Sequence, residues 1–352
     1  MKRQLLGVAA ILLSISTYAQ DNPLWMRYCA ISPDGTTIAF TYKGDIYTVP
    51  STGGRASQIT TNPAHDTKPI WSPDGKKIAF ASDRMGSMDI FEVNKEGGIP
   101  KRLTTHSGNE TPVAYKDAGH ILFLANIMPT VEDAQFPSGQ FQQVYEVNTE
   151  GGRPALFSSM PMEDISINHT GNTLLYHDKK GYEDPWRKHH TSSITRDIWL
   201  CSLNGNRTFR KQTTFNGEDR TPVWASDDKS FYYLSEEKGS FNIFKRDIDG
   251  NTSKQITNHT KHPVRFLSAA SNGTLCYGYD GEIYTVKEGA IPQKVQISIV
   301  TDKNDKDLIR QIKRSGATEI SLSPDAKEIA FVLRGDVYVT STEYSTTKQI
   351  TR

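Results

Sequence analysis

The sequence of 352 residues is poor in cysteine: Cys29, Cys201 and Cys276 are the three present. An odd number in three strand-like contexts argues against a disulfide framework and favours buried small hydrophobic side chains. The chain also lacks a strong net charge, since the formal value of +1 falls to about −1 without Lys2 and Arg3. Such a balance predicts no general attraction to nucleic acids or to anionic lipid.

Several motifs of catalytic and binding sites are missing. The sequence contains no Gly-x-Ser-x-Gly elbow, no His-Glu-x-x-His and no phosphate-binding loop. These motifs mark large classes of serine hydrolases, zinc peptidases and nucleotide-binding proteins. The adjacent pair His189-His190 is a weak metal candidate, because neighbouring residues on a strand point to opposite faces. We therefore predict no catalytic residue, no metal site and no cofactor in this chain.

The first 19 residues predict a signal peptide. Lys2 and Arg3 form a positive n-region, residues 5–15 an apolar h-region, and Thr17-Tyr18-Ala19 a small-residue cleavage site. A buried N-terminal strand is the alternative, and the complete three-part pattern disfavours it. Because the apolar run is short for a membrane span and no second candidate follows, we expect an exported, periplasmic chain without a membrane anchor.

The rest of the chain is organised by a repeated turn and a set of short strands. In Ser72-Pro73-Asp74-Gly75 the proline presets φ, the aspartate tolerates the third turn position, and the glycine accepts a left-handed exit. Short strands with the signatures Asp89-Ile90-Phe91 and Arg102-Leu103-Thr104 follow. The same markers recur in phase about every 40 residues, which is the blade period of β-propellers. Related turns begin at Ser32 and Ser323, and degenerate ones at Tyr115, Asn168, Ala225 and Ser271.

The repeat predicts an all-β fold. Four short strands joined by tight turns form one blade, and seven such units can be counted. We expect a six-bladed β-propeller of four-stranded antiparallel blades over residues 22–299, a charged linker at 300–315, and the first blade of a second, incomplete propeller at 316–352. The alternative is a single seven-bladed ring. Because the first and sixth units each contain their own terminal strand, at 25–31 and 294–299, we expect the ring to close by side-chain packing alone.

Two insertions, at 127–141 and 179–195, fall between the second and third strands of their blades, where loops project from one face of the ring. The second insertion contains Trp186 and the densest basic cluster of the chain, Arg187, Lys188, His189 and His190. Our hypothesis is that this loop leans over one mouth of a central channel, where its cations attract peptide carboxylates. The alternative is a structural clip with Trp186 tucked against its blade.

The entry to each innermost strand supplies a second group of candidate residues. The pattern is a polar pair, a proline, a β-branched residue and an aromatic residue, as in Asp66-Thr67-Lys68-Pro69-Ile70-Trp71. Since innermost strands surround the channel, the polar residues at their starts should form a collar that contacts passing peptides. The structural alternative is a set of solvated turns capping the ring. The candidates for this collar are His65, Asp66, Glu110, Asp219, Arg220 and His262.

These motifs carry a family resemblance. The Ser-Pro-Asp-Gly turns resemble the broad TolB-like, WD-like propeller class. More specifically, residues 178–199 together with His262-Pro263-Val264-Arg265-Phe266-Leu267, 315–319 and 334–340 resemble the N-terminal part of exported tricorn-type serine peptidases. The resemblance covers essentially the whole chain after the leader. It implies a six-bladed propeller followed by a seven-bladed one, then a PDZ-like module and a core with a serine nucleophile and a histidine. None of the residues of that core has a counterpart here.

We therefore expect a non-catalytic propeller segment of a periplasmic tricorn-like peptidase, which gates short peptides to or from a serine-peptidase core. Its partners would be those peptides and the downstream domains of the same polypeptide, and a homo-oligomer stays open. One alternative is a freestanding TolB-like periplasmic propeller that binds a protein partner. Another is the gating propeller of a prolyl-oligopeptidase-type hydrolase. The coding sequence beyond Arg352 would separate these expectations.

Overall fold

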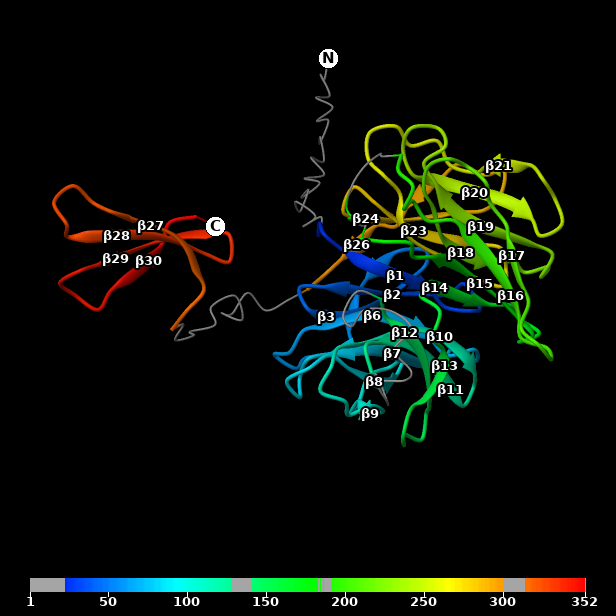
Figure 1. The fold of residues 1–352 in the computed structure, drawn as a ribbon, viewed down its shortest axis with the longest axis horizontal. Helices are drawn as coiled ribbons and strands as arrows, with labels where there is room; N and C mark the ends of the chain where they lie inside the picture. The colour runs from blue at the N-terminus through cyan, green and yellow to red at the C-terminus, as the bar shows by residue number, and fades with distance from the viewer. Residues whose placement is uncertain are drawn as a thin grey trace, which may run out of the picture. The chain divides into compact units, whose positions relative to one another are not determined.

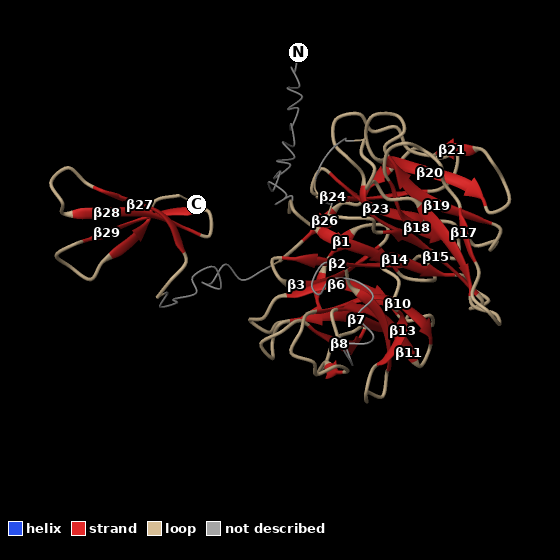
Figure 2. Ribbon diagram, in the orientation of Figure 1, coloured by secondary structure: helices blue, strands red, loops and turns tan. Residues whose placement is uncertain are grey.

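The structure of the protein, a computed structural model, describes residues 23–127, 141–182, 184, 186, 191–300 and 314–351. Figure 2 shows that these residues form strands, turns and loops, and among them no helix is long and apolar enough to cross a membrane. The chain divides into two compact units, residues 1–301 and 302–352, which we describe separately.

The first unit contains six four-stranded sheets, and within each sheet the strands pair antiparallel in chain order (Figure 1). Blades 1 and 2 contain β1 (Arg27–Ile31), β2 (Thr37–Tyr42), β3 (Asp45–Pro50) and β5 (Ser57–Gln58), then β6 (Asp66–Trp71), β7 (Lys77–Ser82), β8 (Asp89–Asn94) and β9 (Lys101–Arg102). Blades 3 and 4 contain β10 (Glu110–Asp117), β11 (His120–Ala125), β12 (Gln143–Asn148) and β13 (Ala155–Ser158), then β14 (Met162–Ile167), β15 (Thr173–Asp178), β16 (Ile198–Ser202) and β17 (Phe209–Lys211). Blades 5 and 6 contain β18 (Asp219–Trp224), β19 (Ser230–Ser235), β20 (Asn242–Asp247) and β21 (Ser253–Gln255), then β22 (Arg265–Ala269), β23 (Leu275–Tyr279), β24 (Glu282–Val286) and β25 (Gln293–Lys294).

The hydrophobic core shows that these sheets are blades of one ring. Six apolar clusters lie among the described residues, and each is shared by two neighbouring blades. The cluster that contains Cys29 of β1 and Cys276 of β23 joins blade 6 to blade 1 and completes the circle. Both thiols are buried, as is Cys201, which confirms the prediction for the three cysteines. The ring therefore closes with six blades, and the alternative of a single seven-bladed ring is wrong.

The repeated turn forms as predicted. In the first copy, Gly35 has a φ of +76°, and its N–H donates to the Ser32 carbonyl at 2.8 Å. The Asp34 carboxylate accepts from the backbone N–H of Thr36 at 3.0 Å. Ala326 takes a φ of +58° at the same place in the last unit, where the sequence has no glycine. These side-chain hydrogen bonds fix the link between the first and second strands of a blade.

Ring closure differs from the prediction. The chain after β25 does not continue as the outermost strand of blade 6 but forms β26 (Ile297–Ser298), which pairs parallel with β4 (Gly54–Arg55) of blade 1. The backbone N–H groups of Gly54 and Ala56 donate to the Gln296 and Ser298 carbonyls at 2.8 and 2.9 Å. The expectation of closure by side-chain packing alone is therefore wrong. The residues after position 294 extend past the outer edge of blade 6, and this allows the main-chain hydrogen bonds to blade 1. We call the β4–β26 pair the clasp.

The second unit is one more four-stranded sheet, orange to red in Figure 1. Its strands are β27 (Ala317–Leu322), β28 (Glu328–Leu333), β29 (Asp336–Ser341) and β30 (Thr347–Gln349). None of their side chains is buried, whereas the equivalent strands β2 and β7 of the ring are almost entirely buried. Taken by itself, the described part of this unit has the sequence pattern of a blade and consists of one sheet.

Candidate functional site

The acidic residues of the predicted collar lie at the starts of the innermost strands, but their carboxylates are buried. Asp66 is 0 % exposed, and both of its oxygens accept from the Arg84 guanidinium at 2.9 Å. Glu110 and Asp219 are also at most 1 % exposed. Since the three side chains are enclosed within the ring, they do not form a solvated collar. The physical reason is that the sheet faces, and not the sheet edges, pack against each other around the ring.

Two of these buried carboxylic acids titrate abnormally. Burial raises the pKa of Glu110 to about 7, against the opposing effect of the Thr104 hydroxyl, while Asp89 adds to the shift. Burial likewise raises the pKa of Asp219 to about 7, although hydrogen bonds from Ser235 and Thr213 oppose it. A carboxyl group that is buried without a cation in contact favours its neutral form.

The other collar candidates occupy different environments. Arg220 is 7 % exposed, contacts Glu218 at 3.4 Å and lies over the Phe241 ring at 4.0 Å. His65 is exposed, and the Nε2 atom of the half-buried His262 lies 3.3 Å from Asp280. Arg187, Lys188 and His189 lie outside the described residues. The candidates that the structure describes are therefore distributed over strand starts and turns.

A different set of side chains meets around the ring axis. Five innermost strands contain a β-bulge at which a residue other than glycine has a φ between +48° and +58°. This backbone conformation is uncommon for such residues, and it re-aims the side chain out of the alternating pattern of the strand. Blade 3 has Pro112, whose φ is fixed, at this place. The five bulge residues, which we call the axial residues, are Tyr28, Lys68, Asp164, Thr221 and Phe266.

The axial residues contact one another between blades. The rings of Tyr28 and Phe266 lie 4.8 Å apart, and the Lys68 Nζ lies over the Tyr28 ring at 5.8 Å. Thr221 donates its hydroxyl to Asp164 at 2.6 Å. Burial raises the pKa of Tyr28, Arg27 opposes this shift, and Asp164 adds to it. Since Tyr28 belongs to blade 1 and Asp164 to blade 4, opposite blades interact across the axis.

Trp186, a described residue of the inserted loop of blade 4, lies beside the axial residue Phe266. Both insertions fall between second and third strands, as predicted: β11 ends at Ala125 and β12 begins at Gln143, and β15 ends at Asp178 and β16 begins at Ile198. The Trp186 ring is 6.2 Å from that of Phe266 in blade 6, and its carbonyl accepts from Arg265 at 2.9 Å. The guanidinium groups of Arg27 and Arg265 lie 5.0 and 4.9 Å from its centroid. Trp186 thus contacts blades 6 and 1 rather than lying against its own blade.

The wall of the axis formed by blades 4 and 5 is a connected polar network. The Nδ1 atom of His177 accepts from the Thr221 N–H at 3.2 Å, so Nε2 carries the proton toward Glu163 at 3.3 Å. Glu163 also accepts from Lys179 at 2.7 Å. Burial opposes ionisation, yet the partners His177 and Lys179 hold the pKa of Glu163 well below its ordinary value. Each carboxylate oxygen of Glu163 therefore has a hydrogen-bond partner, whereas the Asp164 side chain is half exposed.

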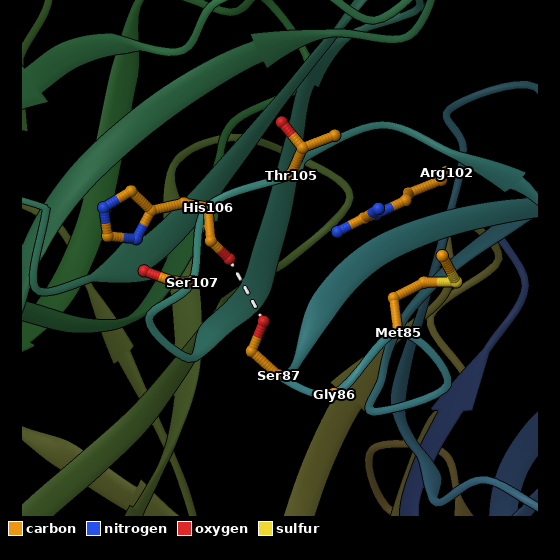
Figure 3. Close-up of a pocket in the computed structure, with 7 residues that line it drawn as sticks. All are labelled: Met85, Gly86, Ser87, Arg102, Thr105, His106 and Ser107. Atoms are coloured by element: carbon orange, nitrogen blue, oxygen red, sulfur yellow. Dashed lines mark hydrogen bonds between the residues drawn. The ribbon is translucent and has the colours of Figure 1, made fainter.

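A separate pocket of about 320 Å³ lies near blade 2 and is shown in Figure 3. Its Ser87 hydroxyl donates to the His106 carbonyl at 3.1 Å, and the His106 ring accepts from the Gly108 N–H at 2.9 Å. Arg102 is held by Asp89 at 2.7 Å. The Ser87 hydroxyl is thus hydrogen-bonded to a backbone carbonyl and not to the imidazole of His106. Across the described ranges, no group of three or more acidic, histidine or cysteine side chains is arranged to hold a metal ion.

Comparison with known proteins identifies this ring. Residues 23–290 match the family described as the tricorn protease N-terminal beta propeller domain. The chain belongs to this family. A crystal structure of the tricorn protease superposes on 93% of this chain and 31% of that chain, with a TM-score of 0.71 and 21% identity, which supports the same fold.

Curated relatives of this tricorn-type propeller are much longer proteins. Tricorn protease homolog 1 of Streptomyces coelicolor is 26% identical over 79% of this chain and 25% of its own length. The tricorn protease homolog of Saccharolobus solfataricus is 26% identical over 80% of this chain and 26% of its own length. The tricorn protease of Thermoplasma acidophilum is 25% identical over 90% of this chain and 29% of its own length. The chain therefore spans between a quarter and a third of the length of these three relatives.

Proposed function

We propose that this propeller is a non-catalytic segment of a tricorn-like peptidase, in which it gates the passage of short peptides to or from a serine-peptidase core elsewhere in the polypeptide. The observation that carries the proposal is the crowded axis. Contacting side chains of blades 6, 1 and 2, and of blades 4 and 5, lie there, and Trp186 of an inserted loop packs on Phe266 and Arg265. Such a constriction admits an extended peptide more readily than a folded protein.

The charges at the axis favour a peptide over other solutes. Arg27 and Arg265 at the end covered by Trp186, Lys68 within the axis, and Asp164 opposite it provide both signs of charge. Mixed charge suits a chain that has an ammonium group, a carboxylate and amide groups in between. Membership of the tricorn protease propeller family supports a connection to peptide hydrolysis.

A substitution in the inserted loop tests the gate in the full-length peptidase. Trp186→Ala should change kcat/KM several-fold for long peptides relative to a short chromogenic substrate, because the side chain that spans the ring end is lost. Phe209→Ala is the matched control, since Phe209 is an exposed aromatic residue on the outermost strand of the same blade. Unchanged length dependence in Trp186→Ala would contradict the gate. Peptide turnover by this chain alone would contradict its non-catalytic role.

We also propose that the protein is exported to the periplasm. The support is the three-part pattern of residues 1–19, with its basic start, apolar centre and small-residue end. Cell fractionation followed by N-terminal sequencing tests the proposal, and a periplasmic protein that begins at Gln20 is the expected result. A cytoplasmic protein that retains Met1 would contradict it.

A further inference from the structure

Lys68 is an unusual cation because it is partly buried and has no carboxylate in contact. Its Nζ lies over the Tyr28 ring at 5.8 Å, and the described part of the chain offers it no ion pair. Burial lowers the pKa of Lys68; Asp164 and Glu163 oppose that shift, and Lys179 adds to it. An ammonium group removed from water without a partner is costly, and an anion that binds beside it relieves this cost.

Asp164 presents the complementary group on the opposite wall. Its Oδ2 accepts from the Thr221 hydroxyl at 2.6 Å and lies 3.6 Å from the His177 Nδ1. That Nδ1 accepts from the Thr221 backbone N–H, so it does not donate a hydrogen bond to Asp164. The Asp164 side chain is 49 % exposed, so its Oδ1 can receive a donor from the axis.

Lys68 and Asp164 influence each other electrostatically without forming an ion pair. The rings of Tyr28 and Phe266 lie 4.8 Å apart, and the Lys68 Nζ lies over the Tyr28 ring, so these two aromatic residues adjoin the Lys68 ammonium group. Both charged groups are placed by the same device, a bulge with positive φ in an innermost strand: +54° at Lys68 and +48° at Asp164. The two charged groups are therefore placed by the backbones of two different blades, 2 and 4.

We propose that the axis of the ring contains a binding site for a zwitterionic ligand, namely a free amino acid or very short peptide. Lys68 binds the α-carboxylate, Asp164 binds the α-ammonium group, and Tyr28 and Phe266 contact an apolar side chain. The proposal deepens the proposed function and rests on it for the choice of a peptide as ligand. Arg27 and Arg265 beside Trp186 would draw the carboxylate toward the axis.

Calorimetry with the dipeptide alanyl-phenylalanine and the full chain tests this site without any peptidase activity. The free dipeptide should bind about tenfold more tightly than either its N-acetyl form or its C-terminal amide, because each blocked form loses one charged contact. Equal affinities for the free and blocked forms, or no binding of the free form, would overturn the proposal. Because no substitution is involved, this comparison stands even if a variant fails to fold.

Two variants assign the ends of the ligand. Lys68→Gln should lose the preference for the free carboxylate over the amide and keep the preference for the free amine, whereas Asp164→Asn should do the reverse. Lys229→Gln is the matched control, because Lys229 is an exposed lysine in the turn that follows β18. If both variants weaken the binding of the free, N-acetyl and amide forms of the dipeptide equally, the residues act on the fold and the assignment is wrong. A gate defect in Trp186→Ala with normal dipeptide binding would separate the two proposals.

Discussion

At the scale of single residues, the most informative side chain is a carboxylic acid that the fold keeps from ionising. Glu110 has an ordinary pKa of 4.5 and a pKa of about 7 in the folded protein. The folded state therefore binds a proton more tightly than the unfolded state between these two values. By linkage, the contribution of Glu110 to stability is lost as the pH rises from about 4.5 to about 7.

We expect Glu110→Gln to flatten the pH dependence of stability. The melting temperature of the wild-type protein should fall between pH 5 and pH 8. The melting temperature of the variant should fall less, so that the variant is the more stable protein at pH 8. The melting temperature of the variant should still decline with pH, because the pKa of Asp219 is also raised to about 7. Thermal denaturation at a series of pH values measures this, with Glu96→Gln as the control because the Glu96 side chain is 84 % exposed. Parallel curves for wild type and Glu110→Gln would contradict the assignment.

At the scale of elements, neighbouring blades are joined by one repeated hydrogen bond. The indole of Trp71, at the end of β6, donates to the Ala30 carbonyl of blade 1 at 2.8 Å. Trp224, at the end of β18, donates in the same way to the Ser166 carbonyl of blade 4 at 3.0 Å. In blades 2 and 5, the tryptophan that ends the innermost strand thus links its blade to the preceding one.

Trp71→Phe should lower the free energy of unfolding by about 1–3 kcal/mol, since a partly buried carbonyl loses its donor and the smaller ring leaves a gap. Trp224→Phe should behave similarly because its contact is equivalent. Trp25→Phe should change stability by no more than about 0.5 kcal/mol, because Trp25 is 70 % exposed. Urea denaturation followed by circular dichroism measures all three, and an equal effect in Trp25→Phe would refute the role of the indole hydrogen bond.

The elements were readable from the sequence because the turn motif and the strand signatures depend on local chemistry. The conformation of the axial residues could not be predicted from the sequence. Lys68 and Thr221 each precede a proline, a position that favours extended backbone, yet both have positive φ. The neighbouring blades impose this conformation, and no short-range pattern encodes it. Burial of Asp66, Glu110 and Asp219 was missed for a related reason, because the sequence gives the strand start but not the face that packs against the next blade.

At the scale of the whole molecule, the clasp depends on a glycine. Gly53 has a φ of +91°, and a Cβ added there would lie 2.7 Å from the Gln296 carbonyl oxygen. Gly151 occupies the equivalent turn of blade 3 with a φ of +89° and has nothing within 4 Å of an added Cβ. The two glycines share the backbone conformation and differ in the contact with the clasp.

Gly53→Ala should therefore lower the melting temperature more than Gly151→Ala. Both variants place an L-residue at positive φ, which costs about 1–2 kcal/mol, and only the first also forces β4 away from β26. Hydrogen exchange should show faster exchange at Gly54 and Ala56 in Gly53→Ala alone. Equal melting temperatures and equal exchange in the two variants would show that the clasp does not stabilise the ring.

Because the β1 sheet is covered by β22 and β23, the first blade made by the ribosome is the last to gain its second neighbour. At the usual speed of synthesis this delay lasts on the order of ten seconds. During that interval an apolar sheet face stays open to other nascent chains. A chaperone that holds the unfinished chain would thus benefit this protein more than one built from sequentially completed domains.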